Sequence, residues 1–298
     1  MQLPLSILVY QRVIAEPDPL FPERVDRRRL EQHLRLLTRW FRVLPLSVAV
    51  RQLRARTLPG RAVCITFDNG YAETVDVALP LLQRHAISAT FFVASRFLDG
   101  GRLWSDTVID TIRQAPAGRL NLGRYGFGVY DVSCPMRRRV VIDMLIETLN
   151  RLPTAERAER IAAMARAGGT RMLCPDQLLA LHRAGMDIGA HTAGHSALSM
   201  MSNADACTDI AAGRNRLEDL LQRPVSLFAY QNEGPGRDVE QHHVNMLRSQ
   251  GFDAAVTSVR GAARADTDPF ALPRFAPRNH SSGRFLFHMG TTLLTAPA

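Results

Sequence analysis

Apolar and polar positions alternate between strand-like and helix-like periods along most of the chain. Short apolar runs rich in β-branched residues predict buried strands at 62–67, 89–93, 186–190, 225–230 and 253–257. Apolar residues at helical spacing lie around these runs and predict helices at about 74–84, 176–184, 205–221 and 239–249. A strand, a helix and a strand within some thirty residues form a βαβ unit, so the pattern predicts a parallel sheet.

The middle of the chain follows a different pattern. From Gly100 to about Ala167 it shows no clear strand, and a Gly-rich connection joins the first two of three helical stretches, at about 105–114, 136–151 and 154–166. We expect one domain over residues 1–298, with a helical insertion at about 100–170 that covers part of a barrel.

The first ten residues have a short apolar run and no basic region, which predicts a first strand rather than a signal peptide. No stretch approaches the ~18 consecutive apolar residues of a transmembrane helix. The cysteines, which form no CxxC pair, argue against a disulfide framework and a cysteine zinc site; they are Cys64, Cys134, Cys174 and Cys207. We therefore expect a cytoplasmic location.

The formal charge of +9 comes entirely from arginine, because the chain contains no lysine. Such a balance can indicate a polyanionic partner. The arginines are interspersed with acids, and the only triplets are 27–29 and 137–139. We attribute the excess to codon bias, and we expect no nucleic-acid partner because no basic stripe or aromatic platform accompanies the charge.

Three polar clusters follow predicted strands, at the ends where parallel α/β folds bind their ligands. They are Asp68 with Asn69, His191 with His195, and Gln231 with Asn232 and Glu233. Two histidines four residues apart on one helical turn would point the same way, as a divalent metal requires. Two imidazoles and one carboxylate-like oxygen leave positions open for water and substrate, which is typical of a catalytic metal site.

These motifs resemble the polysaccharide deacetylase (NodB-homology) family, carbohydrate esterase family 4. Residues 66–70 read Thr-Phe-Asp-Asn-Gly and resemble its TFDDG motif, and residues 191–195 read His-Thr-Ala-Gly-His and resemble its H-[ST]-x-x-H motif. Three further segments are similar to family segments: 9–13 to Y-H-x-V, 89–93 to ATFFV and 227–230 to FAYP. The resemblance runs through nearly the whole chain and implies a deformed (β/α) barrel with about seven parallel strands.

The resemblance also implies the chemistry, which is metal-dependent removal of acetyl groups from a carbohydrate or glycolipid. Asp68 matches the family's catalytic base, and Asn69, His191 and His195 match its metal ligands. The implied metal is divalent, with zinc favoured. The positions that the resemblance assigns to the substrate are Gln11, Tyr230, Gln231 and Asn232.

The sequence departs from the family at several of these positions. Asn69 replaces an anionic ligand, Gln11 stands where the family usually has histidine, and Gln231 replaces the proline of FAYP. The segment 277–280 reads Pro-Arg-Asn-His where related sequences tend to read P-W-D-R, so His280 is only a candidate for the general acid. A neutral oxygen at position 69 predicts a metal that is weakly bound or absent. Two hypotheses stay open: a divergent deacetylase, and an inactive family member that binds a glycan or a protein.

Overall fold

The computed structural model describes residues 3–165, 168–231, 240–277 and 281–294. It divides into two compact units. Unit 1 comprises residues 1–16, 25–99 and 173–298, and unit 2 comprises residues 17–24 and 100–172. The prediction of a single domain with a helical insertion stays a prediction.

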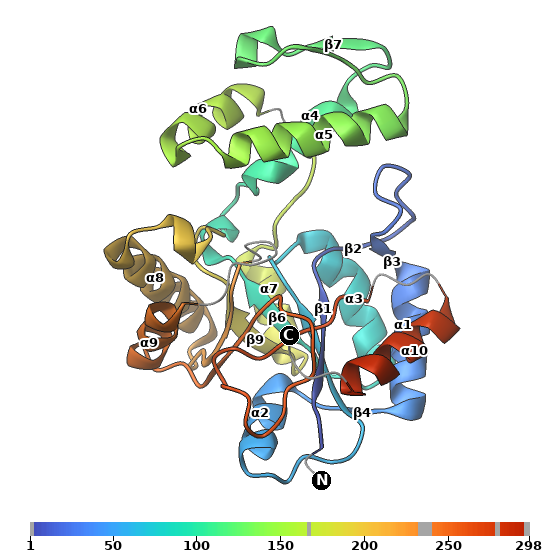
Figure 1. Ribbon diagram of the computed structural model, residues 1–298, viewed down its shortest axis with the longest axis vertical. Coiled ribbons are helices and arrows are strands. Elements are labelled where there is room, and N and C mark those ends of the chain that lie inside the picture. Colours follow the sequence, from blue (N-terminus) through green and yellow to red (C-terminus); the bar gives the residue numbers. More distant parts are fainter. Residues whose placement is uncertain (1–2, 166–167, 232–239, 278–280, 295–298) are drawn as a thin grey trace. The chain divides into compact units, whose positions relative to one another are not determined.

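Unit 1 is built on a curled parallel sheet with the strand order β1-β5-β6-β9-β10-β11, in which β4 also pairs with β5 (Figure 1). The strands are β1 (Ser6–Tyr10), β4 (Arg42–Val43), β5 (Ala62–Phe67), β6 (Thr90–Val93), β9 (Asp187–Ala190), β10 (Leu227–Ala229) and β11 (Ala254–Val256). Every pairing among them is parallel. This confirms the predicted deformed (β/α) barrel with about seven parallel strands.

The segment 272–275 lies between the two edge strands of this sheet. Phe275 forms a parallel bridge with Leu8 of β1, and Leu272 forms one with Val256 of β11. Backbone hydrogen bonds from Val9 N to Phe275 O (3.0 Å) and from Thr257 N to Leu272 O (2.8 Å) join both edges to the segment. It therefore brings Arg274 between the ends of β1 and β11, although Arg274 is far from β1 in the sequence.

Side chains of unit 1 alternate between two apolar layers, as the period of a strand requires. Leu227 and Ala229 of β10 belong to the inner cluster with Ile7, Cys64 and Phe92. Phe228 and Tyr230 belong to the outer cluster, which the surrounding helices complete. Those helices are α1 (Arg27–Trp40), α3 (Ala72–Arg84), α7 (Pro175–Arg183), α8 (Asn203–Leu221), α9 (Gln241–Ser249) and α10 (Ser282–Leu294). A short parallel pair, β2 (Val13–Ile14) and β3 (Val25–Asp26), precedes α1.

Helix α2 (Leu46–Arg54) packs on the inner cluster instead of the outer one. Its buried residues Leu46, Ala49, Val50 and Leu53 contact the inner layer at the amino-terminal ends of the strands. The side chain of Asp187, at the start of β9, accepts a hydrogen bond of 3.2 Å from Ser47 N in its first turn. The helix thus covers the barrel at the end opposite to the predicted site.

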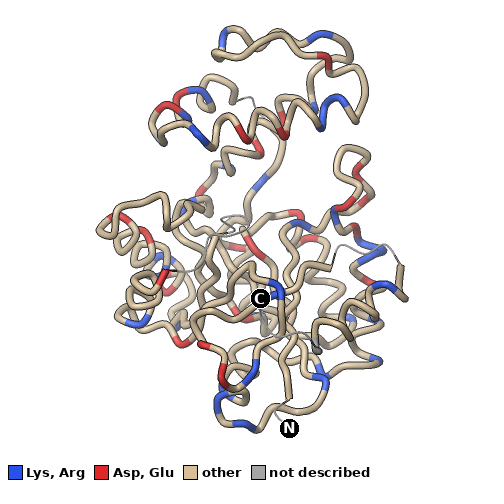
Figure 2. The backbone as a smooth tube through the Cα atoms, in the orientation of Figure 1, with Lys and Arg blue, Asp and Glu red and all other residues tan. Residues whose placement is uncertain are grey.

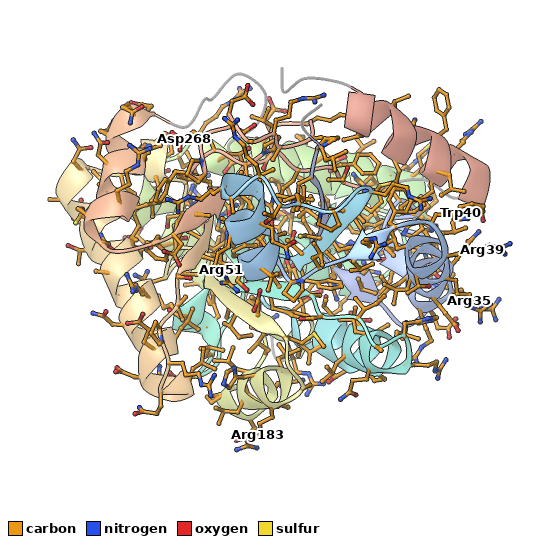
Figure 3. The ribbon with its side chains drawn as sticks, turned by 90° about the horizontal axis from the view of Figure 1, so that it is seen from below. Arg35, Arg39, Trp40, Arg51, Arg183 and Asp268 are labelled. Atoms are coloured by element: carbon orange, nitrogen blue, oxygen red, sulfur yellow. The ribbon has the colours of Figure 1, made fainter. Side chains whose placement is uncertain are left out.

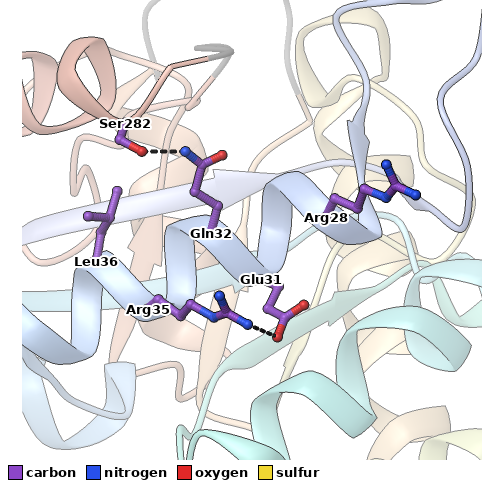
Figure 4. Close-up of a pocket in the computed structure, with 6 residues that line it drawn as sticks. All are labelled: Arg28, Glu31, Gln32, Arg35, Leu36 and Ser282. Atoms are coloured by element: carbon purple, nitrogen blue, oxygen red, sulfur yellow. Dashed lines mark hydrogen bonds and ion pairs between the residues drawn. The ribbon is translucent and has the colours of Figure 1, made fainter.

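Helix α10 was not predicted from the sequence. It packs on α1, where the rings of His33 and Phe285 stack with centroids 4.2 Å apart, and Gln32 hydrogen-bonds to Ser282. A surface pocket lies where the two helices meet, lined by Arg28, Glu31, Gln32, Arg35, Leu36 and Ser282 (Figure 4). Glu31 and Arg35 pair with each other in this pocket, which contains none of the predicted site residues.

Unit 2 holds the three helices expected in the insertion, α4 (Trp104–Gln114), α5 (Pro135–Asn150) and α6 (Thr154–Met164). The expectation that it lacks strands is wrong. The Gly-rich connection forms an antiparallel pair, β7 (Arg119–Asn121) and β8 (Val129–Asp131). These strands are short and largely exposed, so no apolar alternation marks them in the sequence.

The strand predicted near the start of the chain is present. Residues 6–10 form the strand β1, and no helix in the described residues is long and apolar enough to cross a membrane. The four cysteines are free thiols, and burial raises the pKa of the Cys64 thiol inside β5. Cys64 therefore acts as a small apolar side chain.

Candidate active site

The turn after β5 places Asp68 and Asn69 at the carboxyl-terminal end of the strand. Asn69 and Gly70 both have left-handed backbone, with φ angles of 76° and 84°. Asparagine tolerates this region better than most residues. A Cβ atom at Gly70 would lie only 3.1 Å from Leu173 Cδ2, so glycine suits both the conformation and the packing there. The turn lets two consecutive side chains serve two different parts of the site.

Asp68 forms a buried bidentate ion pair with Arg274. Arg274 Nη1 donates to Asp68 Oδ1 (2.7 Å) and Nη2 donates to Oδ2 (2.8 Å). The two residues are only 6% and 3% exposed. Arg274 also donates from Nε to the Thr257 carbonyl (2.8 Å) and from Nη1 to Thr66 Oγ1 (3.2 Å). Four hydrogen bonds thus fix the guanidinium, and its fork holds the carboxylate plane in one orientation.

His191 and His195 follow β9, but they do not lie on a helical turn. That prediction is wrong: residues 191–195 form a loop in which Thr192 (φ 47°) and His195 (φ 55°) are left-handed. The loop still brings the two imidazoles together, with ring centroids 5.1 Å apart. Gly213 of α8 makes room for it, because a Cβ atom there would lie 3.0 Å from Ala193 N.

A carboxylate on α8 holds the same loop from behind. Asp209, which is 5% exposed, accepts a hydrogen bond of 2.8 Å from Ala193 N at Oδ2. Its other oxygen, Oδ1, accepts 2.9 Å from Arg96 Nη2, and Arg96 N donates to the Ala193 carbonyl (3.0 Å). Asp209 and Arg96 therefore fix the backbone between the two histidines.

Asn69 Oδ1 is the point at which the two histidines converge. It lies 3.1 Å from His191 Nε2 and 3.0 Å from His195 Nε2. The other ring nitrogen of His191, Nδ1, lies 2.8 Å from the Ala229 carbonyl and must donate its proton there, since a carbonyl only accepts. In a neutral imidazole, Nε2 then carries a lone pair that points at Asn69.

Both imidazoles are held neutral. Burial lowers the pKa of His191, and Arg274 acts in the same direction against the opposing effects of Asp68 and the Ala229 carbonyl. Burial, and then the neighbouring His191, lower the pKa of His195 well below its ordinary value. Neutral imidazole is the form that binds a metal ion.

The three converging side chains fit a divalent cation. His191 Nε2 and Asn69 Oδ1 both carry lone pairs and lie 3.1 Å apart. They repel each other unless a cation or a hydrogen-bond donor lies against both atoms. Ligands about 2.1 Å from one octahedral ion are roughly 3 Å apart, which matches the spacing seen here. In the described part of the chain, no group of three His, Cys, Asp or Glu side chains could hold a metal ion. The cluster described here has two histidines, and its third ligand is the amide of Asn69.

The residues predicted to contact substrate have different surroundings. Gln11 is exposed after β1, and Gln231 is partly buried, with no hydrogen-bond partner for its side-chain oxygen among the residues that the structure describes. Tyr230 packs its ring against Phe228 in the outer layer, and burial raises the pKa of its hydroxyl. Asn232 and His280 lie outside the described residues. The assignment of substrate-binding residues stays a prediction.

Arg274 and Asp209 were not identified from the sequence. A charged residue inside the apolar segment Leu272-Pro273-Arg274-Phe275 is the signal that marks Arg274. Asp209 carries a weaker signal, because an aspartate on a long helix is ordinarily exposed. Only the folded chain shows that both are buried against the motif residues.

The sequence matches the profile of the family described as polysaccharide deacetylase over residues 55–255. This span covers more than half of the chain and includes β5, β9 and β10 with the polar residues that follow them. The chain belongs to the polysaccharide deacetylase family, whose members are hydrolases acting on carbon–nitrogen bonds other than peptide bonds. A comparison with curated proteins gives no match.

Several solved structures share the fold. The Streptococcus pyogenes deacetylase PplD, in complex with acetate, has 18% identity and a TM-score of 0.67, covering 97% of this chain and 99% of its own. IcaB from Ammonifex degensii has 18% identity and a TM-score of 0.61, covering 97% of each chain. A de-N-acetylase from Aggregatibacter actinomycetemcomitans has 12% identity and a TM-score of 0.62, covering 96% of this chain and 99% of its own. At these identities the likeness concerns the fold alone.

Proposed function

We propose that the protein is a metal-dependent deacetylase that hydrolyses N- or O-acetyl groups on a sugar or polysaccharide. The observation that carries this proposal is the juxtaposition at the end of β5. Asp68 is held rigidly by Arg274, and the next residue, Asn69, meets the two histidines. A fixed carboxylate beside three converging donors is what hydrolysis by an activated water requires.

Asn69, His191 and His195 are the residues that would hold the metal. A divalent cation held there would polarise an acyl oxygen and would make a water molecule more acidic. The three ligand atoms contribute no negative charge, so an ion would be held weakly, and zinc would suit the two imidazoles best. Asp209 and Arg96 keep the loop of the two histidines in place, so that the donors converge before an ion arrives.

Asp68 acts as the base. Each of its oxygens accepts one hydrogen bond from Arg274 and retains a lone pair for a water proton. The water oxygen bonds to the acyl carbon, and its proton passes to Asp68. The bond from the acyl carbon to the sugar nitrogen or oxygen then breaks, and that atom takes up a proton in place of the one that Asp68 accepted from the water. The products are acetate and a free amine or hydroxyl.

A second candidate, a family member that binds a glycan or protein without catalysis, is favoured by one feature of the same cluster. Turning the Asn69 amide by 180° would bring its NH₂ group toward both imidazoles. The amide would then donate to His191 Nε2 and His195 Nε2, and the cluster would be satisfied with no ion. An aspartate at this position could not do so when ionised.

Calorimetric titration of the metal-free protein with zinc, cobalt and nickel separates the two candidates. The deacetylase proposal expects one ion per chain, bound weakly in wild type and more weakly in His195→Ala. A partly exposed histidine on α9, His242, supplies the control variant His242→Ala, which should bind as wild type does. No saturable binding, or equal binding by His195→Ala, would favour the binding protein.

A further inference from the structure

The net positive charge of the chain is confined to one segment. Residues 27–61 contain ten arginines and one acid, Glu31, so the formal net charge of this segment is +9. The rest of the chain contains 37 − 10 = 27 arginines and 28 − 1 = 27 acids, and is therefore neutral. Codon bias spreads arginine evenly and does not deplete acids locally, so it does not account for this distribution.

Six of these arginines lie at the amino-terminal ends of the strands, opposite to Asp68. We name this surface the basic end, and it comprises Arg39, Arg42, Arg51, Arg54, Arg56 and Arg61. The register places two of them side by side, because Arg42 of β4 pairs with Ala62 at the start of β5 and Arg42 N donates to the Arg61 carbonyl. Arg51 and Arg54 lie in the last turn of α2, which covers this end of the barrel. Figure 2 shows basic positions around the N-terminus, at the bottom of the view.

All six side chains are exposed, and none has an acidic partner among the described residues. Three of them, Arg39, Arg51 and Arg54, lie in last turns, where the helix dipole favours a cation. The dipole does not explain the other three, which lie outside helices. Arg56 and Arg61 even occupy left-handed backbone (both φ 58°), where glycine would cost less.

Apolar side chains accompany the charge at the same end. Trp40 is 46% exposed, and the Arg39 guanidinium carbon lies over its ring, 5.4 Å from the ring centroid. Leu3, which precedes β1, is 42% exposed. Figure 3, seen from below, shows Arg35, Arg39 and Trp40 at the outer side of α1. An exposed indole among arginines suits the boundary between lipid headgroups and acyl chains.

We propose that the basic end binds the surface of an anionic lipid bilayer. Uncompensated arginines supply attraction to anionic headgroups, and Trp40 with Leu3 supplies shallow apolar contact. The protein would lie on the bilayer without spanning it. Because the site is at the opposite ends of the same strands, it would remain open to the aqueous phase.

Sedimentation with vesicles tests this proposal. Wild type should bind vesicles of phosphatidylcholine with about one third phosphatidylglycerol, and should not bind vesicles of phosphatidylcholine alone; binding should fall as salt rises. Each arginine near such a surface raises the affinity for the vesicles by a factor of about five. The variant Arg42→Gln/Arg51→Gln/Arg54→Gln should therefore bind the vesicles roughly a hundredfold more weakly. The control Arg119→Gln/Arg171→Gln/Arg284→Gln removes three exposed arginines elsewhere and should bind nearly as wild type does.

A second measurement does not depend on the triple variants folding. In Trp104→Phe the only tryptophan is Trp40. Its fluorescence emission should shift to the blue when anionic vesicles are added, and should not shift with vesicles of phosphatidylcholine alone. An unchanged emission together with no sedimentation would overturn the proposal. Equal losses in the two triple variants would also overturn it, since net charge would then be the cause. Binding to single-stranded DNA or heparin with none to vesicles would assign the surface to another polyanion.

Discussion

Arg274 and Asp68 are joined by two parallel hydrogen bonds, although 206 residues separate them in the sequence. The pair is buried, so each charge depends on the other for its solvation. The same contact carries the candidate base and closes the barrel, because Arg274 lies on the segment between β1 and β11. The pair therefore contributes both to the stability of the fold and to the proposed catalysis.

Removing one partner of the pair should destabilise the protein strongly. Arg274→Met leaves the Asp68 carboxylate buried and unpaired, and we expect unfolding in urea to show a loss of about 3–5 kcal/mol. Asp68→Leu/Arg274→Met removes both charges and should lose less than Arg274→Met does. The exposed pair of Arg248 with Asp268 supplies the control, since Arg248→Met should cost at most about 1 kcal/mol. A double variant less stable than Arg274→Met would contradict this account.

Restoring the charge at position 69 should strengthen metal binding. Asn69→Asp places a carboxylate where Asn69 Oδ1 meets His191 and His195, and charge attraction should raise affinity at least roughly tenfold. Calorimetry with zinc, cobalt and nickel measures this. Asn245→Asp, on an exposed position of α9, adds the same charge away from the site and should change nothing. Equal affinities of Asn69→Asp and wild type would show that position 69 does not face the metal.

Asp209 should act on the metal site through the loop that it holds. Asp209→Ala removes the acceptor for Ala193 N, and we expect metal affinity to fall about 10–100-fold with an altered visible spectrum of bound cobalt. Asp205→Ala, at an exposed position of the same helix, is the matched control. An unchanged cobalt spectrum in Asp209→Ala would limit Asp209 to a role in stability.

The order of strands and helices was predictable, because apolar period and strand length are local properties of the sequence. The placement of Asp68, Asn69 and His191 at strand ends followed from that order. The contact of Arg274 with Asp68 was not predictable, because it depends on a segment that enters the sheet between β1 and β11. The loop of His191 and His195 was predicted as a helical turn, since spacing alone does not reveal the left-handed residues that shape it.

Unit 2 should lose stability in acid through Asp18. Burial works to raise the pKa of this carboxyl, but hydrogen bonds from Arg113 and from Leu20 N, with the charges of Arg113 and Arg24, lower it overall. Because folding lowers this pKa, the ionised carboxyl stabilises the fold at pH values above its ordinary pKa of 3.8. This contribution is lost as the pH falls through the pKa of the folded state. The free energy of unfolding in urea should therefore fall less between pH 5 and pH 2 in Asp18→Asn than in wild type. An equally steep fall in the variant would contradict the assignment.

The central claim is that Asp68 is the base of a working deacetylase. Release of acetate tests it most directly, measured over a broad panel of N- and O-acetylated sugars and oligosaccharides with zinc, cobalt or nickel supplied. We expect slow release by wild type, faster release by Asn69→Asp, and a loss of about 10²–10⁴-fold in Asp68→Asn, provided that circular dichroism shows the variant folded. Wild type that releases acetate no faster than Asp68→Asn on every substrate would contradict the claim and leave the protein a binding member of its family.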